Sequence, residues 1–172
     1  FFSGQGAMFF AGSWDLANLC STYTDMNGKW DVAVLPKCPN PESGDGRAVI
    51  SNSVSYATAA EGKNKDTAMD FLKFLASEEG QKIQGESGVA IPAYNGLEDT
   101  WVNTFAEKGY DIHPENIIPM FDYSVKYVNN PSRPSWEPKV EQAVLDIYAG
   151  NTSVDDGIQN MQNIVTEAIA EE

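Results

Sequence analysis

The sequence predicts an α/β fold that is rich in helices and contains few strands. Apolar residues recur at helical spacing in several segments, whereas β-forming residues are confined to a few short runs. The length of 172 residues, with 42% hydrophobic and 21% charged residues, is that of one ordinary domain with a substantial core. The strands are too few to form a stable sheet, so we expect their missing partners to precede Phe1.

The first part of the chain alternates apolar runs with turns. Residues 7–11 form an apolar run that predicts a strand. A short helix is predicted next, with Ser13 as its N-cap and Asp15 in its first turn, where a carboxylate is favourable. Residues 30–35 are rich in β-forming residues and predict a second strand.

The middle of the chain predicts a loop, short strands and a helix. Residues 37–46 are rich in Pro and Gly, which indicates a loop. Residues 47–60 mix β-forming residues with serines and predict one or two short strands. The clearest helix is predicted at 65–76, with one apolar stripe against the core that comprises Ala68, Phe71, Leu72 and Leu75.

Two shorter helices should follow. Ser77 is the predicted N-cap of a helix that runs through Ile83 and stops around Gly85 and Gly88. The next helix should end by Gly109, and its apolar residues, spaced four apart, are Leu97, Trp101 and Phe105.

The last part of the chain begins with a segment without sustained periodicity. Residues 110–134 carry four prolines and should wind over the surface. Two helices are predicted to close the chain. The first begins near Trp136 and ends at Gly150, and the second opens with a capping box formed by Thr152 and Asp155.

The charge balance narrows the classes of partner. Lys and Arg total 11 against 25 Asp and Glu, which gives a net charge of −14. This charge repels phosphate backbones and anionic membrane surfaces, so we expect no nucleic-acid partner and a ligand that is neutral or cationic. No apolar run approaches the roughly 20 residues that a membrane helix needs.

The ends and the cysteines leave two questions open. The chain starts at Phe1 without an initiator Met or a signal sequence, so we expect it to be a fragment of a longer protein. Cys20 and Cys38 are the two cysteines, too few for a disulfide framework or for a zinc site without other ligands. A disulfide between them and two free thiols both stay open.

The residues give little support to catalysis, and we expect no metal site and no cofactor. His113, the single histidine, lies in the proline-rich segment and should be a solvated loop residue. It could pair with Cys20 or Cys38 in a cysteine-protease arrangement, but nothing in their sequence surroundings favours this. A glycosidase needs only two carboxylates, and four acidic residues lie near aromatic residues: Asp15, Asp31, Asp122 and Glu137.

A pattern of aromatic and small polar residues favours a polyhydroxylated ligand. A sugar packs its C–H groups on an aromatic ring and needs hydrogen-bond partners for its hydroxyl groups. The aromatic residues at predicted turns and corners, where side chains can face a cleft, are Trp14, Trp136, Tyr123 and Tyr127. Trp30 and Trp101 lie within predicted elements and should belong to the core.

Four segments, in order, resemble the family 1 extracellular solute-binding proteins, the sugar receptors of ABC importers, to which the maltose-binding protein is related. Residues 6–19 resemble that family's segment ending in G-S-W, and residues 30–36 resemble its D-V-A-P-L-P strand. Residues 63–81 contain FLKFLASEEGQ, similar to the family's F-L-K-F-L-x-S-E-E-G-Q, and residues 88–93 resemble its G-G-I-P-A-R connector. The resemblance covers essentially the whole chain.

The resemblance implies the C-terminal portion of a two-lobe periplasmic-binding-protein fold of type II. Residues 1–38 would belong to the C-terminal lobe, 39–47 would cross between the lobes, and 48–92 would belong to the N-terminal lobe. Residues 93–172 would then return to the C-terminal lobe as a helical segment.

The resemblance also implies that a sugar or oligosaccharide is held between the lobes and delivered to the transmembrane subunits of an ABC permease, with no bond made or broken. The protein would be extracytoplasmic, in the periplasm or lipid-anchored at the cell surface, and would meet the membrane only through that anchor or the permease. The expected ligand-binding residues are Ser13, Trp14, Asp15, Asn52, Ser53, Tyr123 and Trp136.

The family pattern is not followed everywhere. Residues 51–55 read SNSVS where the family often carries a Gly-rich run near the cleft, and Tyr94 stands where the connector usually ends in Arg. Two alternatives stay open: the same fold binding a peptide or polyamine, and a glycoside-processing enzyme.

Overall fold

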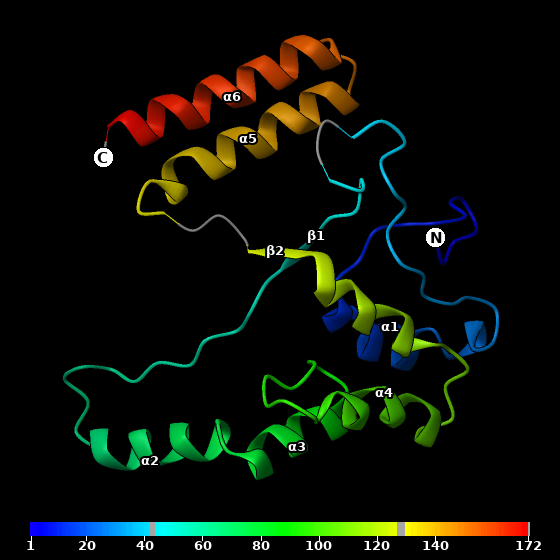
Figure 1. Ribbon diagram of the computed structural model, residues 1–172, viewed down its shortest axis with the longest axis vertical. Helices are drawn as coiled ribbons and strands as arrows, with labels where there is room; N and C mark the ends of the chain where they lie inside the picture. Colours follow the sequence, from blue (N-terminus) through cyan, green and yellow to red (C-terminus); the bar gives the residue numbers. More distant parts are fainter. Residues whose placement is uncertain (42–43, 127–129, 172) are drawn as a thin grey trace. The chain divides into compact units, whose positions relative to one another are not determined.

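The computed structural model describes residues 1–41, 44–126 and 130–171 (Figure 1). The chain divides into two compact units, residues 1–125 and 126–172. The α-helices of the first unit are α1 (Leu16–Thr22), α2 (Lys65–Leu75), α3 (Glu78–Ser87) and α4 (Glu98–Glu107). Its 3-10 helices are η1 (Ser13–Asp15), η2 (Thr24–Met26) and η3 (Pro114–Tyr123).

The core of the first unit lies where α1, α4 and the start of η3 meet. Its buried side chains are Leu16, Cys20, Trp101, Phe105 and Ile112. The Trp101 and Phe105 rings meet edge to face, with centroids 5.2 Å apart. The expectation that Trp101 is a core residue is confirmed, and Trp30, which is half-buried, packs against this cluster.

Polar bonds join α4 to the end of α3. The Trp101 indole N–H donates to the carbonyl of Gly88 at 3.0 Å, and the Thr104 hydroxyl donates to the carbonyl of Glu86 at 2.8 Å. The Lys108 ammonium donates to the carbonyls of Glu86 and Ser87. These donors satisfy carbonyls that the end of a helix leaves without intrahelical partners, so α3 and α4 are joined by hydrogen bonds as well as by apolar packing.

The helices between residues 65 and 109 confirm the sequence predictions. The Ser77 hydroxyl accepts a hydrogen bond from the backbone N–H of Gly80, as an N-cap does, and α3 ends at Gly88. The prediction that the stripe of α2 packs against the core is wrong. No residue of α2 is buried, and Phe71 is 58% exposed.

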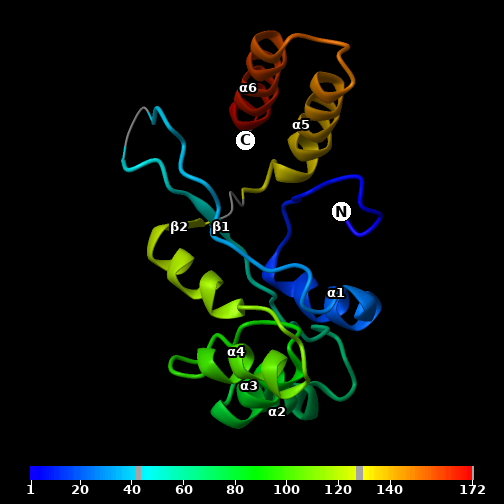
Figure 2. The ribbon, with the colours of Figure 1, turned by 90° about the vertical axis from the view of Figure 1, so that its right-hand side faces the viewer.

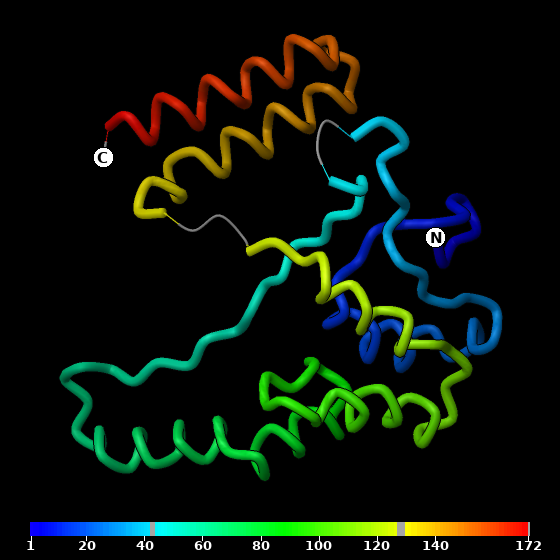
Figure 3. Tube along the Cα trace, in the orientation of Figure 1, coloured from blue at the N-terminus to red at the C-terminus, as the bar shows by residue number. Residues whose placement is uncertain are grey.

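Two of the predicted strands are not formed. Residues 7–11 and 30–35 are irregular, and Met8 and Phe10 are 89% and 82% exposed. A strand needs a neighbouring strand to pair its backbone groups, and a run of β-forming residues cannot supply one. Within the described residues, the sheet consists of β1 (Val49–Ser51) and β2 (Ser124–Lys126), so the predicted strand in 47–60 is confirmed. The chain after β1 runs extended to α2 (Figure 3).

The segment 110–134 is more regular than predicted. It contains the 3-10 turns of η3, begun by Pro114, and then β2. Ile117 and Ile118 on η3 pack against the core. A 3-10 helix has three residues per turn, so its apolar pattern does not match the spacing sought for an α-helix. Tyr127, an aromatic residue of interest in this segment, lies outside the described residues.

The second unit is a pair of helices, α5 (Arg133–Tyr148) and α6 (Val154–Ala170), which lie side by side (Figures 1 and 2). Gly157 of α6 is buried, and a Cβ there would overlap the side chain of Ile147 on α5. The helices approach closely at this point because glycine has no side chain.

Two capping predictions are corrected. The N-cap of α6 is Ser153, whose hydroxyl accepts from the backbone N–H of Asp156 at 3.1 Å, so the predicted box at Thr152 and Asp155 is displaced by one residue. Ser13 caps no helix, because it lies inside η1, which precedes α1. The apolar and polar pattern fits both registers equally well, and only the local backbone distinguishes them.

Candidate ligand-binding site

Three of the expected ligand-binding residues form one 3-10 turn. Ser13, Trp14 and Asp15 make up η1, and the backbone N–H of Asp15 donates to the carbonyl of Gly12 at 3.0 Å. Trp14 is 58% exposed, while Ser13 and Asp15 are half-buried. The turn therefore presents a large flat aromatic side chain to the surroundings, with a hydroxyl and a carboxylate beside it.

Gly12 helps to position the Trp14 ring. A Cβ at residue 12 would overlap the indole of Trp14, so the ring lies directly over the Gly12 backbone. Gly12 has an extended conformation, with φ of −91°, which any residue can adopt. The absence of a side chain at residue 12, rather than a special backbone angle, allows this position of the ring.

A hollow of about 460 Å³ lies where three segments of the first unit converge. One wall is formed by residues 34–37 and another by η3 around Tyr123, and Arg47 also lines the hollow. The lining residues are Val34, Leu35, Pro36, Lys37, Arg47, Pro119, Asp122 and Tyr123. This hollow, called the crossing pocket below, thus contains one expected ligand-binding residue, Tyr123.

Arg47 organises the polar side of the crossing pocket. Its guanidinium lies over the Tyr123 ring, 4.9 Å from the ring centroid, and its Nε donates to the Asp45 carboxylate at 2.6 Å. Hydrogen bonding to Arg47 lowers the pKa of Asp45 below its ordinary value, and the same contact raises the pKa of Arg47. Lys37 Nζ is 3.8 Å from the same carboxylate. Arg47, Lys37 and Asp45 were not predicted as site residues, and the sequence signals them only as charges beside a Pro- and Gly-rich loop.

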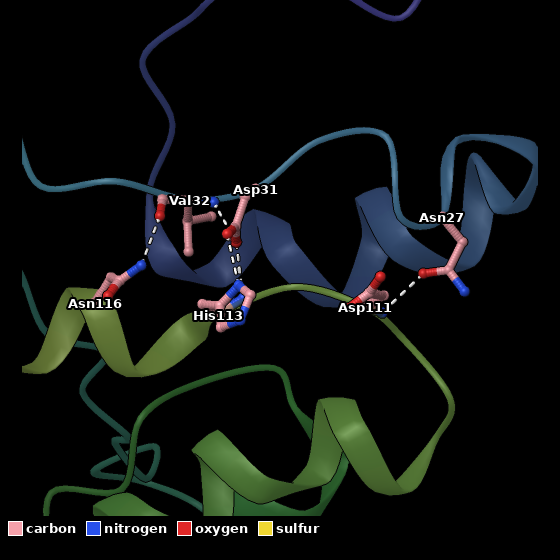
Figure 4. A network of polar contacts seen from close by, with 6 residues as sticks. All are labelled: Asn27, Asp31, Val32, Asp111, His113 and Asn116. Atoms are coloured by element: carbon pink, nitrogen blue, oxygen red, sulfur yellow. Dashed lines mark hydrogen bonds and ion pairs between the residues drawn. The ribbon is translucent and has the colours of Figure 1, made fainter.

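A network of side chains ties the segment 27–32 to the segment 109–116 (Figure 4). The Asn27 side chain donates to the carbonyl of Gly109 at 2.9 Å and accepts from the backbone N–H of Asp111 at 2.8 Å. The Asn116 side chain donates to the carbonyl of Val32 at 3.0 Å. Within residues 30–35, which were predicted as a strand, Val32 is therefore bonded to a side chain and not to a neighbouring strand.

Asp31 and His113 point toward one another within this network (Figure 4). Asp31 Oδ2 is 2.6 Å from His113 Nδ1, and Asp31 Oδ1 accepts from the backbone N–H groups of His113 and Val32 at 2.7 and 2.8 Å. Burial acts to raise the pKa of Asp31, but these hydrogen bonds outweigh it and the pKa is lowered. The hydrogen bond to Asp31, followed by charge attraction, raises the pKa of His113. His113 is exposed, as expected, but it is also paired.

The remaining expected ligand-binding residues are on other elements of the chain. Asn52 and Ser53 are exposed just after β1, and the Asn52 side chain accepts from the backbone N–H of Ser53 at 3.0 Å. Trp136 belongs to the second unit, where it is 9% exposed and its indole N–H donates to Asn130 at 3.1 Å. The structure therefore brings Ser13, Trp14 and Asp15 together and places Tyr123 beside Arg47.

The thiols are free: Cys20 is buried and Cys38 is exposed. Burial raises the pKa of the Cys20 thiol, which disfavours the thiolate that a nucleophilic cysteine needs. Within residues 1–41, 44–126 and 130–171, no three His, Cys, Asp or Glu side chains gather as a metal site would require. Over the same residues, no helix has the length and apolar character needed to cross a membrane.

The comparisons with known proteins bear on the first half of the chain. No curated protein matches it. The part of the chain up to the first half of α3 includes Trp14, Arg47, Asn52 and Ser53. This part, residues 1–82, matches the family described as bacterial extracellular solute-binding protein.

Proposed function

We propose that the chain is the C-terminal portion of an extracellular solute-binding protein that binds a sugar or oligosaccharide and delivers it to the permease of an ABC importer. The family match over residues 1–82 supports a solute-binding role in transport. In this role the protein acts by binding and release, outside the cytoplasm, and makes or breaks no bond in its ligand.

The exposed position of Trp14 carries the proposal of a sugar ligand. An aromatic ring that is more than half exposed on a short, hydrogen-bonded turn can stack on the C–H face of a sugar. The half-buried hydroxyl of Ser13 and carboxylate of Asp15 lie on the same turn and can pair with sugar hydroxyl groups. A neutral ligand also avoids the repulsion that a net charge of −14 would exert on an anion.

Tyr123 makes the crossing pocket a second part of the proposed site. Its ring lies beneath Arg47, whose guanidinium has donors left for ligand oxygens beyond its bond to Asp45. Asn52, Ser53 and Trp136 stay in the proposal as ligand-binding residues on the strength of the family resemblance. The assignment of residues 48–92 to an N-terminal lobe, and of residues 1–38 and 93–172 to a C-terminal lobe, is likewise a proposal.

The test is a titration of tryptophan fluorescence with neutral sugars from glucose to maltotriose. We expect a saturable change with one of these sugars, and we expect Trp14→Ala to weaken binding about tenfold or more, equivalent to about 1.4 kcal/mol. Tyr148→Ala is the matched control, since Tyr148 is 84% exposed and lies outside the proposed site. Undiminished binding in Trp14→Ala would remove Trp14 from the site.

The acidic composition favours one other ligand class. A cationic ligand such as a polyamine is attracted by the net charge, so spermidine belongs in the same titration. A response to spermidine with none to the sugars would contradict the proposal of a sugar ligand while keeping the transport role. Release of reducing sugar from an oligosaccharide would contradict the binding role itself and indicate a glycoside-processing enzyme.

A further inference from the structure

Two sets of contacts join the segments that line the crossing pocket. The wall of residues 34–37 begins two residues after Val32. The other wall is formed by the later part of η3, a helix that starts directly after His113. Between these segments, Asp31 and His113 are paired, and Asn116 is bonded to the carbonyl of Val32. In addition, β1, which follows Arg47, pairs with β2, the strand that follows Tyr123.

The connection between residues 31–32 and 113–116 includes a contact whose strength changes with pH. His113 is the single histidine of the chain, and its ring meets Asp31 across 82 residues of sequence at 2.6 Å. The two backbone N–H groups that donate to Asp31 Oδ1 do not titrate, whereas the imidazole contact gains charge attraction when His113 is protonated. Protonation of His113 therefore strengthens this connection, and deprotonation weakens it without removing it.

The surroundings of His113 favour its cationic form. The acidic groups near the ring are Asp31 from the facing segment and Asp111 and Glu115 from its own segment. All three attract a positive charge, in keeping with the raised pKa of His113 and the lowered pKa of Asp31. The contact is an ion pair while Asp31 is ionised and His113 is protonated. This state begins above the acidic pH at which Asp31 is protonated and extends past the ordinary histidine pKa of about 6.5.

We propose that Asp31 and His113 form a pH-sensitive clasp that positions the two walls of the crossing pocket. Deprotonation of His113 loosens the walls formed by residues 34–37 and 119–123, and so does protonation of Asp31. Ligand affinity at the crossing pocket should follow the state of the clasp, a consequence that rests on the proposed function. His113 and Asp31 act here as positioning residues.

The sign of the pH effect follows from the two pKa shifts. A raised pKa for His113 means that its stabilising contribution is fully present below the ordinary histidine pKa and is lost as pH rises through the raised value. A lowered pKa for Asp31 means that its contribution is present above the ordinary aspartate pKa and is lost as pH falls through the lowered value. The walls should be held best at mildly acidic pH.

The deciding measurement uses the ligand-free chain. The single histidine gives one imidazole signal in NMR, and its titration should yield a pKa above 6.5. Backbone amide signals of Val34, Leu35 and Tyr123 should move with the same midpoint. In Asp31→Asn, which preserves the shape of the side chain and a carbonyl oxygen for the backbone bonds, the His113 pKa should fall and the pocket signals should stop following it.

Asp111→Asn is the matched control. It removes a nearby negative charge from the same segment but leaves the Asp31 contact in place, so it should lower the His113 pKa by less than Asp31→Asn does. Circular dichroism checks that both variants are folded. Pocket signals that ignore the His113 titration, or equal His113 pKa values in Asp31→Asn and Asp111→Asn, would overturn the proposal.

A second measurement separates this inference from the proposed function. With maltotriose as the probe, affinity should fall about fivefold between pH 6 and pH 9 in the unsubstituted chain and stay level in Asp31→Asn, a change at the lower end of typical couplings between sites. Absence of any sugar binding would contradict the proposed function and leave the clasp to be judged by the ligand-free titration. Sugar binding without pH dependence, together with unresponsive pocket signals, would contradict the clasp alone.

Discussion

Helices α2 and α4 have similar lengths and comparable apolar stripes, but the stripe of α4 is buried and that of α2 is largely exposed. Trp101 and Phe105 of α4 are 0% and 1% exposed. Phe71 and Phe74 of α2 are 58% and 39% exposed, and no residue of α2 is buried. The stripe of α2 lines a hollow beside residues 56–65, whereas that of α4 lies in the core.

The difference shows what an apolar stripe predicts and what it leaves open. Spacing of three and four residues indicates which face of a helix is apolar, because that spacing follows from 3.6 residues per turn. Burial of that face requires another element with a complementary surface. Helix α4 contacts α3 and η3 and shares its buried cluster with α1, while the described residues place no comparable cover over the stripe of α2.

The largest effect should come from emptying the core beneath α4. We expect Trp101→Ala to lower the free energy of unfolding by about 3–5 kcal/mol, because it opens a cavity and leaves the carbonyl of Gly88 without its donor. Urea denaturation followed by far-UV circular dichroism measures this loss. Trp14→Ala is the control on the exposed turn and should change stability by no more than about 0.5 kcal/mol. Similar losses in the two variants would contradict the assignment of the core to α4.

An intermediate effect on stability is expected in α3, which lies between α2 and α4 in the chain. Gln81 of α3 is 7% exposed, donates to the carbonyl of Leu75 at the end of α2, and accepts from the backbone N–H of Ala93. Gln81→Met keeps the length of the side chain but leaves both backbone groups unpaired, so it should lower stability by about 1–3 kcal/mol. Hydrogen exchange at the Ala93 amide should also accelerate.

The control for Gln81 lies one helical turn further along α3. Gln84 is half-buried and accepts one long hydrogen bond, at 3.4 Å, from the Tyr56 hydroxyl. Gln84→Met should therefore have a smaller effect on stability and none on exchange at Ala93. An Ala93 amide that exchanges equally slowly in both variants would show that Gln81 does not stabilise the connector of residues 88–93.

The smallest effect is expected on the stripe of α2. Phe71→Ala should change the free energy of unfolding by no more than about 0.5 kcal/mol, because the ring is already largely exposed. Phe105→Ala, the same substitution on α4, should lower it by about 3–5 kcal/mol. Equal losses from the two variants, measured by the same denaturation, would mean that α2 is covered in solution.

The candidate site was predictable where its residues are neighbours in sequence. Trp14 and its flanking Ser13 and Asp15 were predicted from the segment ending in G-S-W, and they form a single turn. Tyr123 was predicted from its aromatic character in a proline-rich segment, but its contact with Arg47 spans distant parts of the chain. The Asp31–His113 contact, between residues 82 apart, has no local signal that sequence could reveal.

The sequence by itself determined the α-helices, most of their ends and the net charge. Ser77 and Gly88 bound α3 through interactions within a few residues, and local rules are sufficient for such features. The tertiary structure decided whether an apolar stripe is buried, whether a run such as 30–35 finds a strand to pair with, and which side chains tie distant segments together. These depend on groups that are far apart in the chain, and only folding brings them within the few ångströms over which packing and hydrogen bonds act.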